Sequence, residues 1–449
     1  MIAPPLAGAD APDSPLNPRY TGSPSVQTWR TEDITGHPVN REVVVHPDTG
    51  YVFVANSDGV LVFDGVRWWQ IRTPLADRAE LEGPGRARQL EIDATGRVWT
   101  STPNDVAVLV RPVLDAGESP APLVARSINE LFPPDADEAS FDSPPGGYIS
   151  PSSYPWIMKT PRGMLVRSYE RIFLFGAEGL IQSWNIPDLV DEPWWSEGAL
   201  HVSREGHGIY RLEGDQLKKL TTPGAARILT ALPHSDSGTL WLTTAGPWLA
   251  HGETVTSITS PAARDLLLET IATGAIVLPG GGTAFATQRR GVVILDSAGN
   301  LREVVDTIRG LETDRINDLA LDHTGGLWLT SHVGVFRIQQ DTPFAIHGPT
   351  QGFRGRPRDI RRVGDRLYVA HTDGLAWRET STGRFHDISG IVGDIYKIAG
   401  VGDTLLVAAD NLFSVAHSES TAVANLDSER NELKAIGTSR SIPGGAYLS

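Results

Sequence analysis

A strand signal recurs ten times along this chain, at intervals of about 40 residues. Each copy is a short apolar segment, usually preceded by Gly or Asp, with one large side chain at its centre. Successive centres lie 46, 67, 35, 40, 44, 43, 40, 38 and 41 residues apart, and they are Phe53, Trp99, Val166, His201, Trp241, Phe285, Trp328, Tyr368, Leu406 and Tyr447. A repeat of this length with an aromatic-centred strand in most units is typical of a β-propeller, whose blades bury one another's faces.

The unit around Trp328 shows the anatomy expected of one blade. An alternating strand is followed by an Asp-x-x-Gly turn, a core strand, a third strand and a closing segment. In order, these are expected at 316–321, 322–325, 326–330, 335–338 and 344–346.

Glycines mark the turn that follows the core strand. Four of them come six residues after the centre of their strand, namely Gly59, Gly291, Gly334 and Gly374. We predict glycine at this blade turn because the backbone there is expected to need positive φ.

The aromatic centres are expected to wedge between adjacent blades, because a rigid ring buries a large area there. These blade-core positions are Phe53, Trp99, Trp241, Phe285, Trp328 and Tyr368. We assign them a structural role.

The number of units exceeds the roughly 4–8 blades of one ring. We therefore predict an all-β propeller of about seven four-stranded blades, closed as one ring over residues 20–347, and the first blades of a second, truncated propeller over 348–449. A strand near Val26 to Arg30 is expected to complete the last blade, because closure removes exposed sheet edges. Residues 1–19 are interpreted as a signal-peptide remnant or a disordered tail.

One long gap breaks the repeat between Trp99 and Val166. The excess lies in a proline-rich insertion over 111–155, and proline lacks the N–H that a sheet ladder needs. We expect a long loop on one face of the ring, without regular sheet. It is either a lid or docking loop or a mobile insertion with no partner, and its apolar run from Ile128 to Phe132 could pack back on the ring.

Composition excludes several classes of function. The net charge of −15 disfavours a nucleic-acid partner, because phosphate binding needs clustered Lys and Arg. The chain has no Cys, which excludes disulfides and thiolate metal sites. No apolar stretch is long enough for a transmembrane helix, so membrane attachment is expected only through a helix further downstream.

No catalytic, cofactor or metal signature stands out, and we predict none of these sites. The 12 His residues form no His-x-His or His-x-x-x-His pair, and no nucleophile elbow, P-loop or calcium loop occurs. The pairs Trp68–Trp69 and Trp194–Trp195 fit either packing between blades or a sugar or peptide groove. A secreted propeller enzyme, such as a polysaccharide lyase, a glycosidase or a cyclic-peptide lyase, would instead need polar residues from several blades to meet at the centre.

Two segments carry a resemblance to a known family. They are Trp29-Arg30-Thr31-Glu32-Asp33, followed by Gly36, Pro38 and Asn40, and the repeat from Gly310 to Phe336. They resemble the two-component regulator propellers, the periplasmic sensor propellers of bacterial signalling receptors. Two extra residues separate Asp33 from Pro38, and Thr330-Ser331 replaces the usual Gly-Thr. The resemblance spans 26–449 and is strong in the first, second and fifth to eighth units.

The resemblance implies a piece of a large transmembrane receptor with a histidine kinase or diguanylate cyclase output domain. A final unit that stops in mid-strand is expected of such a piece. The chain would then be the periplasmic ligand-sensing region and non-catalytic in itself. The implied partners are a small-molecule or glycan ligand and a second copy of the receptor in a homodimer.

Overall fold

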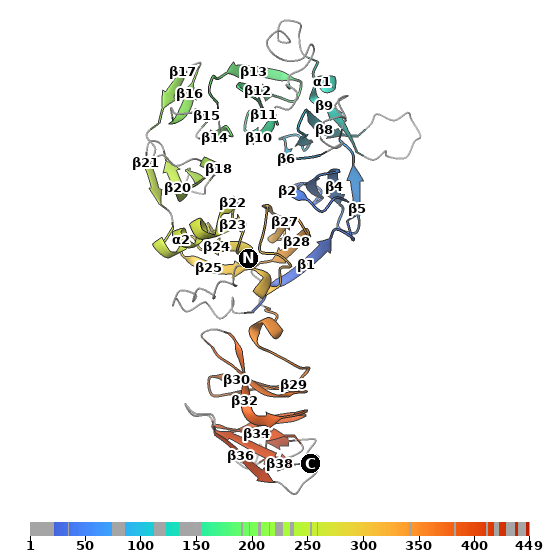
Figure 1. Ribbon diagram of the computed structural model, residues 1–449, viewed down its shortest axis with the longest axis vertical. Helices are drawn as coiled ribbons and strands as arrows, with labels where there is room; N and C mark the ends of the chain where they lie inside the picture. The colour runs from blue at the N-terminus through green and yellow to red at the C-terminus, as the bar shows by residue number, and fades with distance from the viewer. Residues whose placement is uncertain are drawn as a thin grey trace, which may run out of the picture. The chain divides into compact units, whose positions relative to one another are not determined.

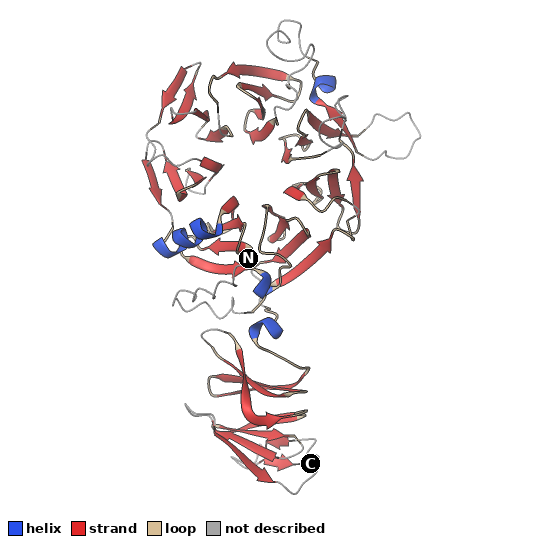
Figure 2. Ribbon diagram, viewed as in Figure 1, coloured by secondary structure: helices blue, strands red, loops and turns tan. Residues whose placement is uncertain are grey.

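The computed structural model describes residues 22–34, 36–73, 86–111, 123–133, 149, 154–189, 192–196, 198–204, 208–214, 216–220, 228–233, 238–251, 254–257, 259–340, 344–380, 383–409, 412–416, 422–427, 436–438 and 446–448. The chain divides into two compact units, Val26–Asp341 and a second unit of Met1–Ser25 and Thr342–Ser449. Strands dominate both units (Figure 2). The predicted tail over 1–19 lies outside the described residues.

Seven four-stranded sheets form the first unit and stand as blades around a common axis (Figure 1). From the innermost strand outward, blade 1 is β2 (Asn40–Val45), β3 (Val52–Asn56), β4 (Gly59–Phe63) and β5 (Trp68–Ile71), and blade 2 is β6 (Gln89–Ile92), β7 (Val98–Ser101), β8 (Val106–Val110) and β9 (Val124–Ser127). Blade 3 is β10 (Trp156–Thr160), β11 (Gly163–Ser168), β12 (Arg171–Phe175) and β13 (Leu180–Asn185), and blade 4 is β14 (Trp194–Ser196), β15 (Ala199–Arg204), β16 (Gly208–Glu213) and β17 (Gln216–Lys219). Blade 5 is β18 (Ile228–Pro233), β19 (Thr239–Thr243), β20 (Gly246–His251) and β21 (Thr254–Ser257), and blade 6 is β22 (Ala272–Val277), β23 (Thr283–Thr287), β24 (Val292–Leu295) and β25 (Leu301–Val305).

Blade 7 is closed by the N-terminal strand. Its order is β26 (Asp318–Leu321), β27 (Gly326–Thr330), β28 (Gly334–Gln339) and β1 (Ser25–Arg30). The predicted propeller fold is confirmed, but the expectation that Phe344–Ile346 closes this blade is wrong. Ile346 instead exchanges two backbone hydrogen bonds of 2.8 Å with Ser23, and both residues belong to the second unit.

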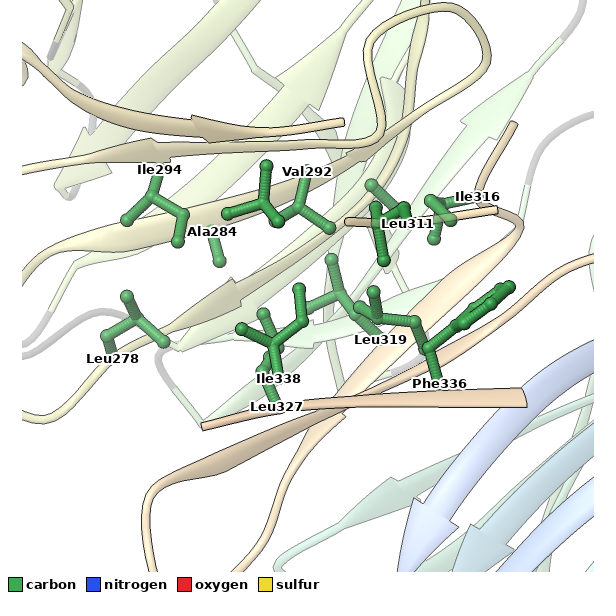
Figure 3. Packing of buried hydrophobic residues seen from close by; sticks show 13 residues of the cluster. Leu278, Ala284, Val292, Ile294, Leu311, Ile316, Leu319, Leu327, Phe336 and Ile338 are labelled. Atoms are coloured by element: carbon green, nitrogen blue, oxygen red, sulfur yellow. The ribbon is translucent and has the colours of Figure 1, made fainter. Parts of the chain in front are cut away.

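The blades adhere through their apolar faces, as the cluster between blades 6 and 7 illustrates (Figure 3). Burial of each Leu, Ile or Phe side chain is worth roughly 1.5–3 kcal/mol, so such clusters hold neighbouring sheets together. This cluster consists of Leu278, Ala284, Ala286, Val292, Ile294, Val305, Leu311, Ile316, Leu319, Leu327, Leu329, Phe336 and Ile338.

The four predicted turn glycines share the close approach of a neighbouring backbone carbonyl, whereas the sequence predicts positive φ at all of them. Gly59, Gly291 and Gly374 have positive φ, at 134°, 62° and 149°, but Gly334 is not among the positive-φ glycines. A Cβ on Gly334 would collide with the carbonyl oxygen of Trp29 in β1. The other three glycines meet a carbonyl of their own blade's outermost strand in the same way. Close approach of the last strand, rather than φ alone, therefore requires glycine at this turn.

The proline-rich insertion contains regular structure, which corrects the prediction for 111–155. Its residues Val124–Ser127 form β9, the outermost strand of blade 2, because this stretch holds none of the segment's prolines. The short helix α1 (Ile128–Leu131) follows, and the side chain of Ser127 caps it by accepting the N–H of Asn129. Ile128 is fully buried in the core of blades 2 and 3, so the expected packing of this run on the ring is confirmed. The proline-containing stretches 112–122 and 134–148, and with them the lid or docking interpretation, lie outside the described residues.

The remaining helical segments are α2 (Pro261–Thr270), which lies between blades 5 and 6 in sequence, and the 3-10 turns η3 (Thr307–Arg309) and η4 (Pro349–Gln351).

The second unit contains two further four-stranded sheets and one two-stranded sheet. They are β29 (Pro357–Val363), β30 (Arg366–His371), β31 (Gly374–Arg378) and β32 (Phe385–Val392), then β33 (Lys397–Val401), β34 (Thr404–Ala408), β35 (Leu412–Ala416) and β36 (Ala422–Asp427), then β37 (Ile436–Thr438) and β38 (Ala446–Leu448).

Candidate functional site

The aromatic blade-core positions lie in the second strand of their sheets and face the core. They are at most 5% exposed, at Phe53, Trp99, Trp241, Phe285, Trp328 and Tyr368. Trp328 shows how such a ring packs between blades, since it stacks on Trp29 with ring centroids 4.9 Å apart and joins the core of blades 7 and 1. Val166 and His201 occupy the equivalent positions of blades 3 and 4 and are also buried.

The side chains of both tryptophan pairs pack against other aromatic rings of the propeller. Trp194 is 3% exposed and stacks on His201, with ring centroids 5.4 Å apart. Trp68 stacks on Phe63 at 4.9 Å, and Trp69 meets the ring of Tyr51 edge-on. These contacts support the packing interpretation over a groove for sugars or peptides.

The Asp-x-x-Gly turn of blade 7 carries a hydrogen-bonded cluster at the edge of the core. Asp322 Oδ2 accepts the indole N–H of Trp328 at 3.0 Å and the Nε–H of Arg337 at 2.7 Å. Its Oδ1 accepts the backbone N–H groups of Thr324 and Gly326 at 2.9 and 2.8 Å. Burial alone raises the pKa of Asp322, but these hydrogen bonds and the Arg337 charge outweigh burial and lower the pKa to about 2. The ionised carboxylate therefore fixes both the turn and the wedge residue.

Blade 2 builds the same cluster independently. Asp93 Oδ2 accepts from Trp99 Nε1 at 2.9 Å and from Arg97 Nε at 2.7 Å, and Oδ1 accepts the N–H of Thr95 at 2.8 Å. Burial raises the pKa of Asp93, and the bonds from Thr95, Trp99 and Arg97 more than reverse this, so that the pKa falls to about 2. The sequence Asp-x-Thr-Gly-x-x-Trp, present in both blades, is thus a structural unit.

Three carboxylates on the innermost strands form the most unusual polar group around the axis of the ring. They are Asp318 on β26, Glu42 on β2 and Glu91 on β6, in blades 7, 1 and 2. The repeat pattern does not single them out. The available signal was an acid within each innermost strand, in the segments DLAL, NREVVV and QLEI.

Two of these carboxylates, Asp318 and Glu42, accept a hydrogen bond from the innermost strand of the next blade. Asp318 Oδ2 accepts the N–H of Val43 on β2 at 3.0 Å. Glu42 Oε2 accepts the N–H of Leu90 on β6. At the next seam the acceptor is Gln89, whose Oε1 accepts the N–H of Ile157 on β10 at 3.2 Å. At each of the three seams from blade 7 to blade 3, a side chain of one innermost strand therefore accepts a backbone N–H of the next, and at the first two seams this side chain is acidic.

Desolvation raises the pKa of all three partly buried carboxyls. It is the main cause that raises the pKa of Glu91 to about 7 and that of Asp318 to about 6. The pKa of Glu42 lies well above its usual range because of burial and, next, the charge of Asp318. Lys159 on β10 acts in the opposite sense on Glu91. Such a group can hold or release protons near neutral pH, a property found both at functional sites and in structural networks.

Positive charge gathers at the seam between blades 7 and 1. Burial and the charges of Arg315 and Arg41 lower the pKa of His332, which follows β27. The chain segments are held together there by Thr330, whose hydroxyl donates to the carbonyl of Arg41 at 3.0 Å. Arg315 Nε donates to Gln288 Oε1 at 2.7 Å.

The second unit repeats the inter-blade bond with a different charge balance. Asp359 on β29 accepts the N–H of Ile398 on β33 at 3.2 Å. Lys397 Nζ lies 3.2 Å from the same carboxylate oxygen, and Arg361 lies 3.6 Å from the other. Here two cations lie within 4 Å of the acid.

Over the described part of the chain, no group of three or more His, Cys, Asp or Glu side chains is arranged to hold a metal ion. None of the helices in that part is both long and apolar enough to cross a membrane.

A comparison of the sequence with protein-family profiles finds no match, and a comparison with curated proteins finds none either. Similarity appears at the level of structure. An extracellular domain assigned to the hybrid two component system BT3049 of B. thetaiotaomicron superposes with a TM-score of 0.60 at 13% identity, over 95% of this chain and 65% of that chain. The chain shares the propeller fold of that extracellular domain. The chain thus spans about two thirds of that domain, and the expected likeness to two-component regulator propellers is confirmed for the fold.

A second structure shares the ring architecture with a different activity. A streptogramin B lyase structure superposes with a TM-score of 0.50 at 14% identity, over 71% of this chain and 98% of that chain. Identities this low show the fold and leave the function of this chain to its own residues.

Proposed function

We propose that this chain is the ligand-sensing propeller region of a bacterial transmembrane signalling receptor, located in the periplasm and non-catalytic in itself. The observation that carries the proposal is the extent of the structural likeness. The similarity to the receptor's extracellular domain runs over 95% of this chain, so it includes blades beyond the first ring. The likeness to the lyase covers 71%.

The polar residues around the axis support a binding role over a catalytic one. A general base needs a carboxylate or imidazole that is free to take a proton from substrate. Asp318 and Glu42 instead accept backbone N–H groups of the neighbouring blade. The Asp322 and Asp93 carboxylates are likewise engaged within their turns.

The ligand that we propose is a small molecule or a glycan, bound where loops from several blades meet. A second copy of the receptor is the proposed protein partner. The output domain, of the histidine kinase or diguanylate cyclase class, and the membrane helix belong to the proposed full receptor.

The proposal is tested by asking whether the chain binds a ligand without converting it to a product. The purified chain is screened by thermal shift against a panel of sugars, oligosaccharides and small metabolites. Ligands that raise the melting temperature are then titrated by calorimetry, incubated with the chain and examined by mass spectrometry. A sensor binds a ligand and returns it unchanged, and the same ligand alters the output of the full receptor in cells. A ligand that binds but leaves the output unchanged would contradict the receptor proposal.

The alternative function is that of a secreted propeller enzyme, which the likeness to the streptogramin B lyase favours. It predicts that the same incubation converts a polysaccharide or a cyclic peptide to a new product. A single substitution of a polar residue at the blade 7–1 seam, such as His332→Ala, would then abolish conversion while the melting temperature stays near that of the parent. Conversion of this kind would replace the sensor proposal.

A further inference from the structure

Blade 3 carries a group of strained backbone positions at one end of its sheet. Of the non-glycine residues that the structure describes, four have positive φ, and three of these belong to the connections of this blade. They are Tyr154, Tyr169 and Asp188, with φ of 49°, 53° and 61°. The first precedes β10, the second follows β11 and the third follows β13. In an antiparallel sheet, the start of the first strand and the ends of the second and fourth strands lie at the same end, so the three residues share one end of blade 3.

The two tyrosines leave the sheet side by side. Trp156 and Arg167 form the terminal pair between β10 and β11. Tyr154 lies two residues before this pair on one strand, and Tyr169 lies two residues after it on the other. Tyr169 is the first residue of the two-residue turn between β11 and β12, where glycine is usual. The two tyrosines are 43% and 53% exposed, so burial of an aromatic side chain does not explain why tyrosine occupies such positions.

Side-chain hydrogen bonds hold the two connections after β11 and β13 together. Arg167 Nε donates to the carbonyl of Tyr169 at 3.0 Å, and its Nη2 donates to the carbonyl of Leu189 at 2.9 Å. Glu170 Oε1 accepts the backbone N–H of Asp188 at 2.9 Å. Strained positions persist where the surrounding structure fixes them, and they concentrate at sites of ligand recognition.

Polar groups accompany the exposed rings. The Arg88 guanidinium lies over the ring of Tyr154, 4.7 Å from its centroid, and the backbone N–H of Tyr154 donates to the carbonyl of Pro103 at 3.2 Å. The Asp188 side chain is half exposed, and its Oδ2 lies 3.2 Å from Nη2 of Arg204. This end of the blade therefore presents two phenol rings and a carboxylate on a backbone that its own bonds fix.

We propose that this end of blade 3 is a carbohydrate-binding site, at which the rings of Tyr154 and Tyr169 stack on the sugar rings of an oligosaccharide and Asp188 accepts a sugar hydroxyl. A phenol ring offers a flat apolar face and a polar tip, which match the C–H face and the hydroxyls of a pyranose. Tyrosine supplies this contact area at little cost in conformational entropy, and the fixed backbone lowers that cost further. The inference rests on the proposed sensing function and names an oligosaccharide as its ligand.

The geometry favours a sugar over a peptide. A bound peptide usually adds to a free strand edge or lays an apolar face into a groove. Tyr169 and Asp188 instead lie in connections between strands, where the backbone is already engaged by Arg167 and Glu170.

The test is titration calorimetry of the purified chain with four neutral hexasaccharides, namely cellohexaose, xylohexaose, mannohexaose and maltohexaose. We expect at least one of them to bind. Tyr169→Gly should weaken this binding about tenfold or more, because it removes one stacking ring. The variant should still melt within about 2 °C of the parent, because glycine adopts positive φ without strain. Tyr169→Phe keeps the ring and should bind about as well as the parent.

Ile271→Gly is the matched control. Ile271 is the fourth residue with positive φ, at 57°, and it is 46% exposed after α2, far from blade 3 in sequence. Its replacement should leave the affinity for the saccharide unchanged. Equal losses in Tyr169→Gly and Ile271→Gly would overturn the proposal, as would the absence of binding to all four hexasaccharides.

Two outcomes separate this site from the proposed function. Binding that Tyr169→Gly leaves intact would refute the site, while the sensing proposal would stand. Conversion of the saccharide to a product, lost in Tyr169→Gly, would support the site and contradict the non-catalytic role.

Nitration of tyrosines in the parent chain keeps the proposal testable if the variants do not fold. The extent of nitration by tetranitromethane is measured by peptide mass spectrometry, with and without the bound hexasaccharide. At about ten times the Kd, nitration of Tyr154 and Tyr169 should fall roughly fivefold or more. Tyr396 of the second unit, which is 37% exposed, should react equally in both samples. Unchanged nitration of Tyr154 and Tyr169 would refute the site.

Discussion

Replacement of Trp328 tests how a wedge residue supports the ring. Its side chain is 4% exposed and stacks on Trp29 of β1, so it couples the core strand of blade 7 to the strand that closes the blade. The ring also tilts against Phe63 of blade 1, with centroids 5.8 Å apart. Trp328→Ala removes a large buried aromatic and leaves a cavity, which usually costs about 3–5 kcal/mol of unfolding free energy.

A Phe substitution separates the indole hydrogen bond from the packing. Trp328→Phe keeps an aromatic wedge but removes the donor to Asp322, a charged acceptor. A hydrogen bond to a charged group is worth about 1.5–3 kcal/mol, and the low end applies because Arg337 and the turn amides still satisfy the carboxylate. Trp241 is the matched control, since it is 5% exposed in the same strand of blade 5 and its indole N–H has no partner among the described residues.

The assay is urea denaturation of the purified variants, followed by circular dichroism at neutral pH. We expect Trp328→Phe to cost about 1.5 kcal/mol more than Trp241→Phe. Equal costs for the two Phe variants would mean that the Asp-x-Thr-Gly-x-x-Trp cluster adds no stability. A cost below about 1 kcal/mol for Trp328→Ala would refute the wedge role altogether.

Three further substitutions probe the other structural arguments. Asp322→Asn removes a carboxylate whose pKa is lowered to about 2. A shift of almost two pKa units corresponds to about 2 kcal/mol of stability, which is present above about pH 4 and lost as the pH falls towards 2. Denaturation of the parent and the variant should therefore show a difference in unfolding free energy at neutral pH but none at strongly acid pH. Gly334→Ala should lower the unfolding free energy by about 1–3 kcal/mol, because the added Cβ meets the backbone of β1. Gly348→Ala is the control and should change the unfolding free energy little, because a Cβ there meets nothing within 4 Å. Equal effects of the two substitutions would contradict the argument that β1 approaches Gly334 too closely for a side chain. Ile128→Ala should cost about 2–5 kcal/mol because this side chain is fully buried under blades 2 and 3, and a negligible cost in the same urea assay would show that the segment does not pack on the ring.

The repeat in the sequence predicted the fold well because blade packing imposes a fixed pattern on each unit. Every one of the ten predicted strand centres, from Phe53 to Tyr447, falls in the second strand of a sheet. The N-terminal strand near Val26 to Arg30 could also be assigned, since an open ring would leave a sheet edge exposed. Proline content misled the prediction at Val124–Ser127, where four proline-free residues suffice for an outer strand.

The inner carboxylates could not be found from the repeat. Asp318 precedes Trp328 by 10 residues, Glu42 precedes Phe53 by 11, and Glu91 precedes Trp99 by 8, so no common spacing marks them. The partners of Asp318 and Glu42 are backbone groups of the next blade, and the offset between neighbouring blades is a tertiary property that strand patterns do not encode. For the same reason the prediction of positive φ at Gly334 is wrong, since the neighbouring strand β1 is what requires glycine there.

The closed ring underlies the site and both proposals, and hydrogen exchange of β1 tests it most directly. In a ring closed by β1 (Ser25–Arg30), the amides of β1 that bond β28 are protected to a degree similar to the amides within β27 and β28. Trp328→Ala should lower the protection of β1 before that of blade 4, because Trp29 loses its stacking partner. Exchange of β1 at the rate of an unfolded peptide, while β27 and β28 stay protected, would show that the N-terminal strand does not close the propeller.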